Sequence, residues 1–456
     1  IYVYNEDMGL GKTLQTISLI LSAPPEGDAP KCTLVICPKS VISNWETQID
    51  RFVKPGVLRV SVYAGSRKQR SKFIPMVNNG EIDVLLSTYE TISSEFDGKV
   101  QDKLGRTLPA IMDCEFHRVV LDEAQTIRNP KSRVFKAIMA IAENSEKRLA
   151  LTGTPIVNRP DDIFSLLHFI GLAPLEDPCY FKTHITEPIQ AKRRAGLSRL
   201  RAGLIYGALR RSKNSASVSG LTMVPKMVEI AYIDYPKGRH KEIHDCLFLA
   251  SQAAFEASIN GRGNIAESEG GINANAAQSM FALLLRVRQS ACAGQLVPQE
   301  AFQRASIVLN QLKDEHGNIN IGKLSSDQGN RLLDMLGSES LDDTKNKLNT
   351  ENLGNSPKID FLVDQIRSQL ADEEKAVVFS QWTQNLDLVE AALRQAGIKT
   401  VRIDGSMETF RRTEAMMILS NDDNVRVLLA SLRAAGTGIN LVNLLYHAFS
   451  CFLSAI

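Results

Sequence analysis

The feature that most constrains this chain is a glycine-rich stretch near its start, which contains Glu6, Asp7, Met8, Gly9, Leu10, Gly11, Lys12 and Thr13. A helix-forming run, Leu14 to Leu21, follows it directly. Glycines here let backbone N–H groups close around a phosphate, and the N-terminus of the following helix adds the positive end of its dipole. The pattern predicts that Lys12 reaches the β- and γ-phosphates of a nucleotide and that the Thr13 hydroxyl holds Mg²⁺.

One position departs from the strict phosphate-binding (P-loop) pattern, which has glycine where Glu6 stands. Taken alone, the stretch therefore also fits a glycine-rich turn that only caps a helix. Residues further along the chain are needed to decide between the two.

Continuous apolar runs recur along the first third of the chain, at residues 31–38, Ile82–Leu86, Arg118–Leu121 and Arg148–Leu151. A continuous run, rather than an alternating one, is typical of a strand covered by helices on both faces. Helical patterns such as Val134–Ala142 lie between the runs. This alternation predicts a parallel α/β sheet with ligands bound at the carboxyl ends of its strands.

A pair of carboxylates follows the third apolar run, at Asp122 and Glu123. A carboxylate that ends a strand, with a P-loop on a neighbouring strand, forms the Mg²⁺ half of a phosphoryl-transfer site. The pattern predicts that Asp122 holds the metal and that Glu123 orients and deprotonates the attacking water. By itself, Asp-Glu after a strand also fits a solvated loop or a helix N-cap.

The fourth run ends in a loop of small residues, Leu151, Thr152, Gly153, Thr154 and Pro155. Hydroxyl groups and glycine at a strand exit allow switchable hydrogen bonds, which suits a loop that couples two sites; an ordinary turn is the alternative.

Four ordered motifs in this half of the chain resemble motifs I, Ia, II and III of the Swi/Snf-type, helicase-like ATPases. They are Asp7–Thr13, Cys37–Ser40 through Asn44-Trp45, Asp122–Gln125 and Leu151–Pro155; Ser87–Tyr89 and Leu209–Lys213 also fit that family. The segment Leu285–Gln289, Cys292 and Leu296-Val297 is similar to the branch that includes helicase-like transcription factor. Gln125 stands where many members have histidine, and we expect its contact with motif III to survive because glutamine both donates and accepts.

A second strand-and-helix alternation begins at Ser356. Its predicted helices are Ile359–Leu370 and Leu386–Ala396, with Gly397 as a C′ glycine, and its predicted strands are Ala376–Phe379, Thr400–Ile403 and Val425–Leu429. The segments after these strands resemble motifs IV and V of the family's second lobe. We therefore expect two RecA-like parallel-sheet lobes, the second incomplete, at residues 1–172 and 355–456, joined by a largely helical insertion at 173–354.

Within the insertion we expect helical, often basic stretches at Lys192–Arg194 and Arg210-Arg211 and the apolar helix Met280–Ala291. Polar segments at Asn260–Ala276 and Asp314–Leu353 favour loops and a linker. Arg210 and Arg211 could either lie on a solvated helix face or bind a phosphate, and the sequence does not decide between these two roles.

The resemblance implies ATP and Mg²⁺ as ligands, with Lys12, Asp122 and Glu123 catalytic and Thr13 and Asp122 on the metal. It assigns nucleotide binding to Asp7, Met8, Gly9, Leu10, Gly11, Lys12, Thr13, Gln125, Gly436 and Gly438.

The resemblance also implies double-stranded DNA as a partner, along with nucleosomes or other DNA-bound proteins. Backbone-tracking contacts need hydroxyls, amides and cations. It assigns them to Lys39, Ser40, Ser87, Thr88, Ser380, Gln381, Ser431 and Arg433.

Composition limits the remaining classes. Lys and Arg total 53 against 51 Asp and Glu, for a formal charge of +2, which leaves room for a local basic groove. The seven cysteines include no C-x₂-C pair, and residues 299–354 contain no cysteine and only His316, so no zinc site or RING finger is expected. The sequence contains no run of about 18 apolar residues, the length that a membrane span needs. The family resemblance implies that the protein is located in the nucleus.

Both ends of the chain depart from the family. It begins with Ile1 rather than Met, and residues 442–456 carry no arginine-containing motif VI. We expect the match to stop after Leu441 and the chain to be a fragment that binds ATP weakly and hydrolyses it poorly. The predicted function is an ATP-dependent double-stranded-DNA translocase of the chromatin-remodelling type; a strand-separating helicase and a non-hydrolysing scaffold are the alternatives.

Overall fold

The computed structural model describes residues 2–7, 9–27, 30–96, 110–156, 159–212, 228–236, 238–259, 276–303, 305, 354–371, 374–435 and 446–450. Its contacts divide the chain into two compact units, which are taken in turn below. Unit 1 comprises Ile1–Lys226 with Thr437–Asn440, and unit 2 comprises Met227–Gly436 with Leu441–Ile456. Among the described residues, no helix combines the length and the apolar character that a membrane span requires.

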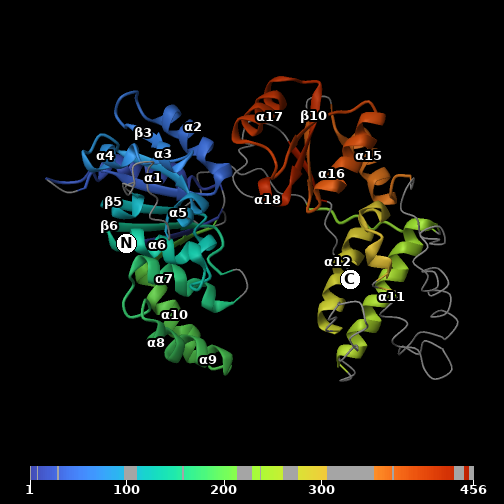
Figure 1. Cartoon of the computed structure of the whole chain (residues 1–456), viewed down its shortest axis with the longest axis horizontal. Helices are drawn as coiled ribbons and strands as arrows, with labels where there is room; N and C mark the ends of the chain where they lie inside the picture. Colours follow the sequence, from blue (N-terminus) through green and yellow to red (C-terminus); the bar gives the residue numbers. More distant parts are fainter. Residues whose placement is uncertain are drawn as a thin grey trace. The chain divides into compact units, whose positions relative to one another are not determined.

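Unit 1 is built on a seven-stranded sheet in the order β3-β4-β2-β5-β6-β1-β7, and all of its strand pairs are parallel (Figure 1). The strands are β1 Tyr2–Glu6, β2 Thr33–Cys37, β3 Val60–Val62, β4 Val84–Thr88, β5 Phe116–Asp122, β6 Ser145–Thr152 and β7 Ala208–Arg211. The four apolar runs of the sequence form β2, β4, β5 and β6, as predicted.

Helices cover both faces of this sheet, which explains why its strands are continuously apolar. On β2, Leu34 packs in a core that includes Ile138 of α6 (Arg133–Glu143). The next residue, Val35, packs on the opposite side with Ile17 of α1 (Lys12–Ser22) and Trp45 of α2 (Ile42–Phe52). The remaining helices of unit 1 are α3 Arg67–Arg70, α4 Phe73–Asn78, α5 Tyr89–Glu95, α7 Phe164–Ile170, α8 Pro178–Phe181, α9 Glu187–Gln190 and α10 Arg194–Gly207.

Two basic stretches differ from the predicted helices. Arg210 and Arg211 lie on strand β7, because this segment pairs in parallel with β1 and extends the sheet. Lys192 has a left-handed backbone conformation with φ 57° and lies between α9 and α10. The helix prediction is therefore wrong for these residues, except that Arg194 begins α10.

Unit 2 contains a four-stranded parallel sheet in the order β11-β8-β10-β9. Its elements are α11 Arg239–Ile259, α12 Ala276–Ser290, α15 Pro357–Gln369, β8 Lys375–Ser380, α16 Thr383–Gln395, β9 Lys399–Ile403, α17 Thr409–Asn421, β10 Val425–Ser431, α18 Leu432–Ala435 and β11 Tyr446–Ser450. The predicted strands and helices of this region are all present. Figure 1 shows α11 and α12 side by side as a helical hairpin.

The segment after α12 packs into the core of unit 2. Cys292 and Leu296 lie in the same apolar cluster as Leu362 of α15 and Val378 of β8. The Ser356 hydroxyl donates to the Cys292 carbonyl at 2.6 Å and also caps α15. The division at 172/173 and 354/355 stays a prediction. The predicted linker Asp314–Leu353 lies outside the described residues, as does the predicted loop Asn260–Ala276 except for Ala276, which begins α12.

Candidate functional site

The predicted P-loop and the predicted carboxylate pair lie at the same edge of the unit 1 sheet. Asn5 of β1 is in register with Thr152 of β6, and Asp122 of β5 is in register with Leu151 of β6. Because the strands are parallel, β1 and β5 end level with each other. Strand β6 lies between them, so the prediction that the two motifs follow neighbouring strands is wrong in that detail.

The P-loop has the backbone that its glycines predict. Gly9 has φ 90° and Gly11 has φ 77°, both in the left-handed region that disfavours residues with a Cβ. Gly11 is the N-cap of α1; among the described residues no side chain caps this helix, and its first turn contains no acidic residue. The Lys12 ammonium donates to the Glu6 carbonyl at 2.9 Å and to the Asp7 carbonyl at 3.4 Å. Met8 lies outside the described residues.

Asp122 is buried and held at each of its oxygens. Its Oδ2 accepts a hydrogen bond from Trp45 Nε1 at 2.9 Å, and its Oδ1 accepts from the Glu123 N–H at 3.0 Å. The buried Tyr89 hydroxyl donates to the Asp122 carbonyl at 2.8 Å. Trp45 and Tyr89 lie in segments that resemble family motifs, but the sequence alone predicts no role for either residue.

The surroundings of Asp122 disfavour its negative charge. Burial is the largest effect and raises the pKa of the carboxyl; the Glu123 charge raises it further, while the Trp45 hydrogen bond and the Lys12 charge lower it, and the net shift is upward. An ionised carboxylate in such a place gains from a cation.

Glu123 has an unusual backbone, with φ 52° and ψ 51°. A non-glycine residue in the left-handed region is uncommon and often marks a functional site. Its side chain begins a chain of hydrogen bonds: Gln125 Nε2 donates to Glu123 Oε2 at 2.7 Å, and Thr152 Oγ1 donates to Gln125 Oε1 at 2.7 Å. The Thr154 N–H then donates to Thr152 Oγ1 at 3.1 Å. Gln125 thus connects the carboxylate pair to the loop after β6.

Two protein-family domains match the sequence of this chain. Residues 4–296, more than half of the chain, match the SNF2-related domain, and residues 357–449 match the helicase conserved C-terminal domain. The chain belongs to the SNF2-related family. The resemblance to Swi/Snf-type, helicase-like ATPases is therefore confirmed.

Three curated relatives are DNA repair protein RAD5A of Arabidopsis thaliana, DNA repair protein rad8 of Schizosaccharomyces pombe and helicase-like transcription factor of Oryctolagus cuniculus. They are 27%, 26% and 28% identical over 90%, 96% and 91% of this chain. The chain spans 44%, 46% and 45% of their lengths, slightly less than half.

A solved structure, the Sulfolobus solfataricus SWI2/SNF2 ATPase core in complex with dsDNA, aligns with 94% of this chain and 73% of that chain at 21% identity, with a TM-score of 0.41. The family assignment rests on the domain matches rather than on this likeness.

The second domain match also corrects one expectation. The prediction that the resemblance stops after Leu441 is wrong, because the helicase C-terminal match continues to residue 449. The apolar tail supplies strand β11, which pairs in parallel with β8 from Tyr446 to Ser450. A short apolar segment is well suited to such a strand.

The residues predicted to contact DNA in unit 1 differ in accessibility. Lys39 is exposed and Ser40 is half-buried in the short segment between β2 and α2. Ser87 and Thr88 end β4 and are buried. The Ser87 hydroxyl donates to the Tyr63 carbonyl at 3.4 Å, and Thr88 caps α5 by accepting from the Thr91 N–H.

In unit 2, Ser380 and Ser431 are buried and lie opposite each other where β8 and β10 end. Gln381 is exposed, and its Oε1 accepts a hydrogen bond from Arg288 Nη2 of α12 at 2.6 Å. Arg433 lies on α18, while Gly436 and Gly438 lie outside the described residues. All of these DNA and nucleotide assignments stay predictions.

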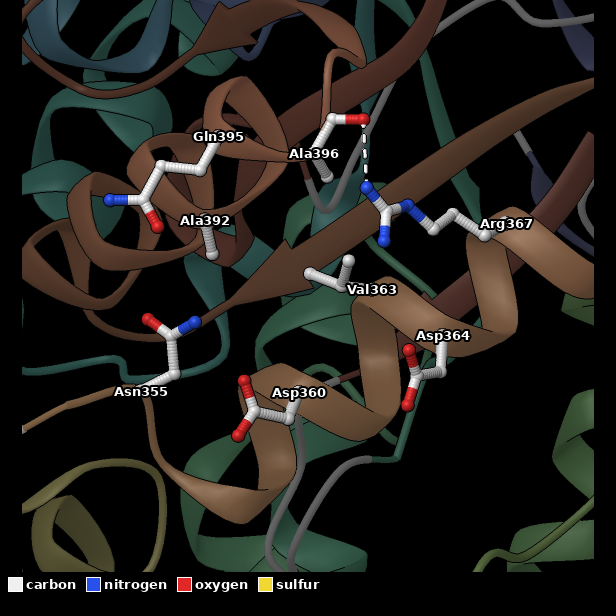
Figure 2. Close-up of a pocket in the computed structure, with 8 residues that line it drawn as sticks. All are labelled: Asn355, Asp360, Val363, Asp364, Arg367, Ala392, Gln395 and Ala396. Carbon is white, nitrogen blue, oxygen red and sulfur yellow. Dashed lines mark hydrogen bonds between the residues drawn. The ribbon is translucent and has the colours of Figure 1, made fainter.

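A separate pocket lies between α15 and α16 of unit 2 (Figure 2), and Arg367 Nη2 donates there to the Ala396 carbonyl at 3.1 Å. It is lined by Asn355, Asp360, Val363, Asp364, Arg367, Ala392, Gln395 and Ala396. None of these is a predicted site residue.

Proposed function

We propose that this protein is a DNA-dependent ATPase that moves along double-stranded DNA without separating the strands. The observation that carries the proposal is the common sheet edge in unit 1. The P-loop follows β1 at this edge, Asp122 and Glu123 lie at the end of β5 at the same edge, and Gln125 connects Glu123 to the loop after β6.

The described residues fit a nucleoside triphosphate. The uncapped N-terminus of α1 provides N–H groups and a positive dipole end for phosphate. The left-handed Gly11 leaves open space where a Cβ would stand, so backbone can approach a ligand closely. The Lys12 ammonium donates to the carbonyls of Glu6 and Asp7, and it would exchange them for phosphate oxygens.

Thr13 and Asp122 are the residues that would hold Mg²⁺. A hydroxyl and a carboxylate suit this hard cation, which prefers oxygen ligands. Trp45 and the Glu123 N–H orient the Asp122 carboxylate without using all of its lone pairs. When bound, Mg²⁺ neutralises charge on the phosphate oxygens.

Glu123 would activate the water that attacks the γ-phosphorus. The new bond forms from water oxygen to phosphorus, the bond from phosphorus to the bridging oxygen breaks, and ADP and inorganic phosphate leave. Glu123 accepts the proton of that water. Because Gln125 donates to the Glu123 carboxylate, a shift of the Thr152 loop would change the position of the base.

The DNA partner is supported by the relatives and by the placement of polar groups. Lys39 and Gln381 are exposed at the carboxyl ends of strands and could contact phosphates. The relatives named for DNA repair, with the double-stranded DNA bound by the Sulfolobus core, favour work on duplex DNA in the nucleus, with nucleosomes or other DNA-bound proteins as obstacles to be moved.

Displacement of a triplex-forming strand from duplex DNA separates translocation from unwinding. We expect slow, ATP-dependent triplex displacement by the wild-type protein and no displacement by Glu123→Gln, which keeps the binding groups but lacks the base. A forked duplex should stay paired. Unwinding of the fork would favour a helicase, while tight DNA binding without ATP turnover would favour the scaffold.

A further inference from the structure

Glu6 is a carboxylate in an unexpected place. It is the last residue of β1, at the position where a strict P-loop has glycine, and its side chain is fully buried. A buried carboxylate is costly unless it is paired and hydrogen-bonded.

Two residues, Arg211 and Gln15, hold this carboxylate. Arg211 of β7 forms an ion pair with Glu6 Oε1, and Gln15 Nε2 of α1 donates to Glu6 Oε2 at 3.1 Å. The Arg211 guanidinium also donates to Gln15 Oε1, which closes a ring of contacts. Gln15 Nε2 in addition donates to the Leu10 carbonyl at 2.8 Å, inside the P-loop.

The same residues fix the lysine of the P-loop. The Lys12 ammonium donates to the Glu6 carbonyl, so a shift of Glu6 moves a hydrogen-bond partner of Lys12. The backbone is tied as well, since the Asp7 N–H donates to the Arg211 carbonyl at 3.2 Å and Glu6 is in register with Arg211. Contacts from β7 and Gln15 therefore reach Glu6, Asp7 and Leu10 of the P-loop.

Strand β7 is an edge strand of the sheet, and among the described residues it is the last element of unit 1 before unit 2 begins at Met227. The Arg211 side chain is 32% exposed, whereas that of Glu6 is 0% exposed. A displacement of the chain after β7 would therefore move Arg211 first, and through Arg211 it would move the buried carboxylate of Glu6.

We propose that Arg211 is a positioning residue that sets the conformation of the P-loop through Glu6 and Gln15, and so couples the chain leading to unit 2 to nucleotide affinity. This inference rests on the proposed nucleotide site. It differs from a direct phosphate contact by Arg211, the alternative that the sequence leaves open.

The test compares nucleotide affinity with loop dynamics in the wild-type protein, Arg211→Gln, Glu6→Gln and the double variant. Affinity is measured with a fluorescent N-methylanthraniloyl ATP and Mg²⁺. Hydrogen exchange of peptides covering residues 6–15 is measured without nucleotide. Arg201→Gln, which removes an exposed arginine of α10 in the same unit, is the matched control.

Arg211→Gln should raise the Kd about tenfold and speed exchange in the P-loop, because Glu6 is left buried without its cation. The effect should shrink in the Glu6→Gln background, since both charges are then absent. If Arg211→Gln does not fold, Arg211→Lys, which keeps the charge but loses the two-pronged contact, should give a smaller rise.

An equal loss of affinity in both backgrounds would show that Arg211 touches the nucleotide, and the proposal would fail. Unchanged hydrogen exchange in Arg211→Gln would also overturn it. If the wild-type protein binds no nucleotide, the proposed function fails, and the exchange data alone decide whether Arg211 positions the loop.

Discussion

Asp122 shows at the scale of one residue how a metal-binding group is prepared. Its carboxylate is buried beside Glu123, and its pKa is raised chiefly by that burial. Trp45 opposes the shift, because its indole N–H donates to the ionised oxygen. The indole N–H therefore favours the ionised carboxylate and orients it, so loss of this donor would raise the pKa of Asp122 further.

Trp45→Phe should destabilise unit 1 by about 2 kcal/mol near neutral pH, the usual size of a hydrogen bond to a charged group. Without the donor, the pKa of Asp122 rises further. The stability difference should therefore be full above that pKa and shrink as pH falls and the carboxyl becomes protonated in both proteins. Denaturant unfolding at several pH values measures it.

The chain contains one other tryptophan, Trp382, which packs against the unit 2 core. Trp382→Phe is the control for loss of an indole. A pH-independent loss in Trp45→Phe, or the same pH profile for both variants, would contradict the role given to the Trp45–Asp122 bond.

Much of the site could be predicted at this scale, since glycine, lysine and paired carboxylates have few other uses in this pattern. Trp45, Tyr89 and Gln15 could not be assigned roles, because each has a hydrogen bond to a segment far away in sequence. Glu6 was seen only as a departure from the pattern. Its meaning depends on Arg211, 205 residues away.

At the scale of elements, the end of α16 shows local sequence chemistry at work. The helix ends at Gln395, and Gly397 follows with φ 78°, the left-handed conformation common after a helix. A Cβ at Gly397 would meet nothing within 4 Å, so any cost of a side chain comes from the backbone alone.

Gly397→Ala should cost about 1–2 kcal/mol of unfolding free energy, the penalty of a left-handed L-residue. Gly405 is the matched control, because it also has open space around its Cβ position but no left-handed φ. Gly405→Ala should be neutral or slightly stabilising. Equal losses of the two variants in thermal unfolding would contradict the assignment of the cost to the left-handed backbone.

Elements with strong local signals were predicted well, and those held by long-range pairing were not. Strands β2, β5 and β10 are long apolar runs buried on both faces, so their patterns stand out. Strand β7 reads Ala-Leu-Arg-Arg and looks helical, yet it is a strand because β1 offers it a partner. Strand β1 was not predicted either, although its Tyr-Val-Tyr run is typical of a strand.

At the scale of the whole molecule, sequence families and packing divide the chain differently. The SNF2-related match ends at residue 296, whereas unit 2 begins at Met227. Helices α11 and α12 thus belong to the first domain by sequence and to the second unit by contacts. Cys292 and Leu296 explain this, since they are buried with the residues of α15 and β8.

The account depends on a phosphate-binding loop and a catalytic glutamate that share one sheet edge in unit 1. The most direct test is the rate of ATP hydrolysis by Glu123→Gln with double-stranded DNA at saturating ATP, compared with the wild-type protein and with Glu143→Gln, an exposed glutamate of α6. We predict a fall of about 10²-fold or more for Glu123→Gln, the usual worth of a general base, with unchanged ATP binding and a wild-type rate for Glu143→Gln. Hydrolysis by Glu123→Gln within a few-fold of wild type would contradict the assignment.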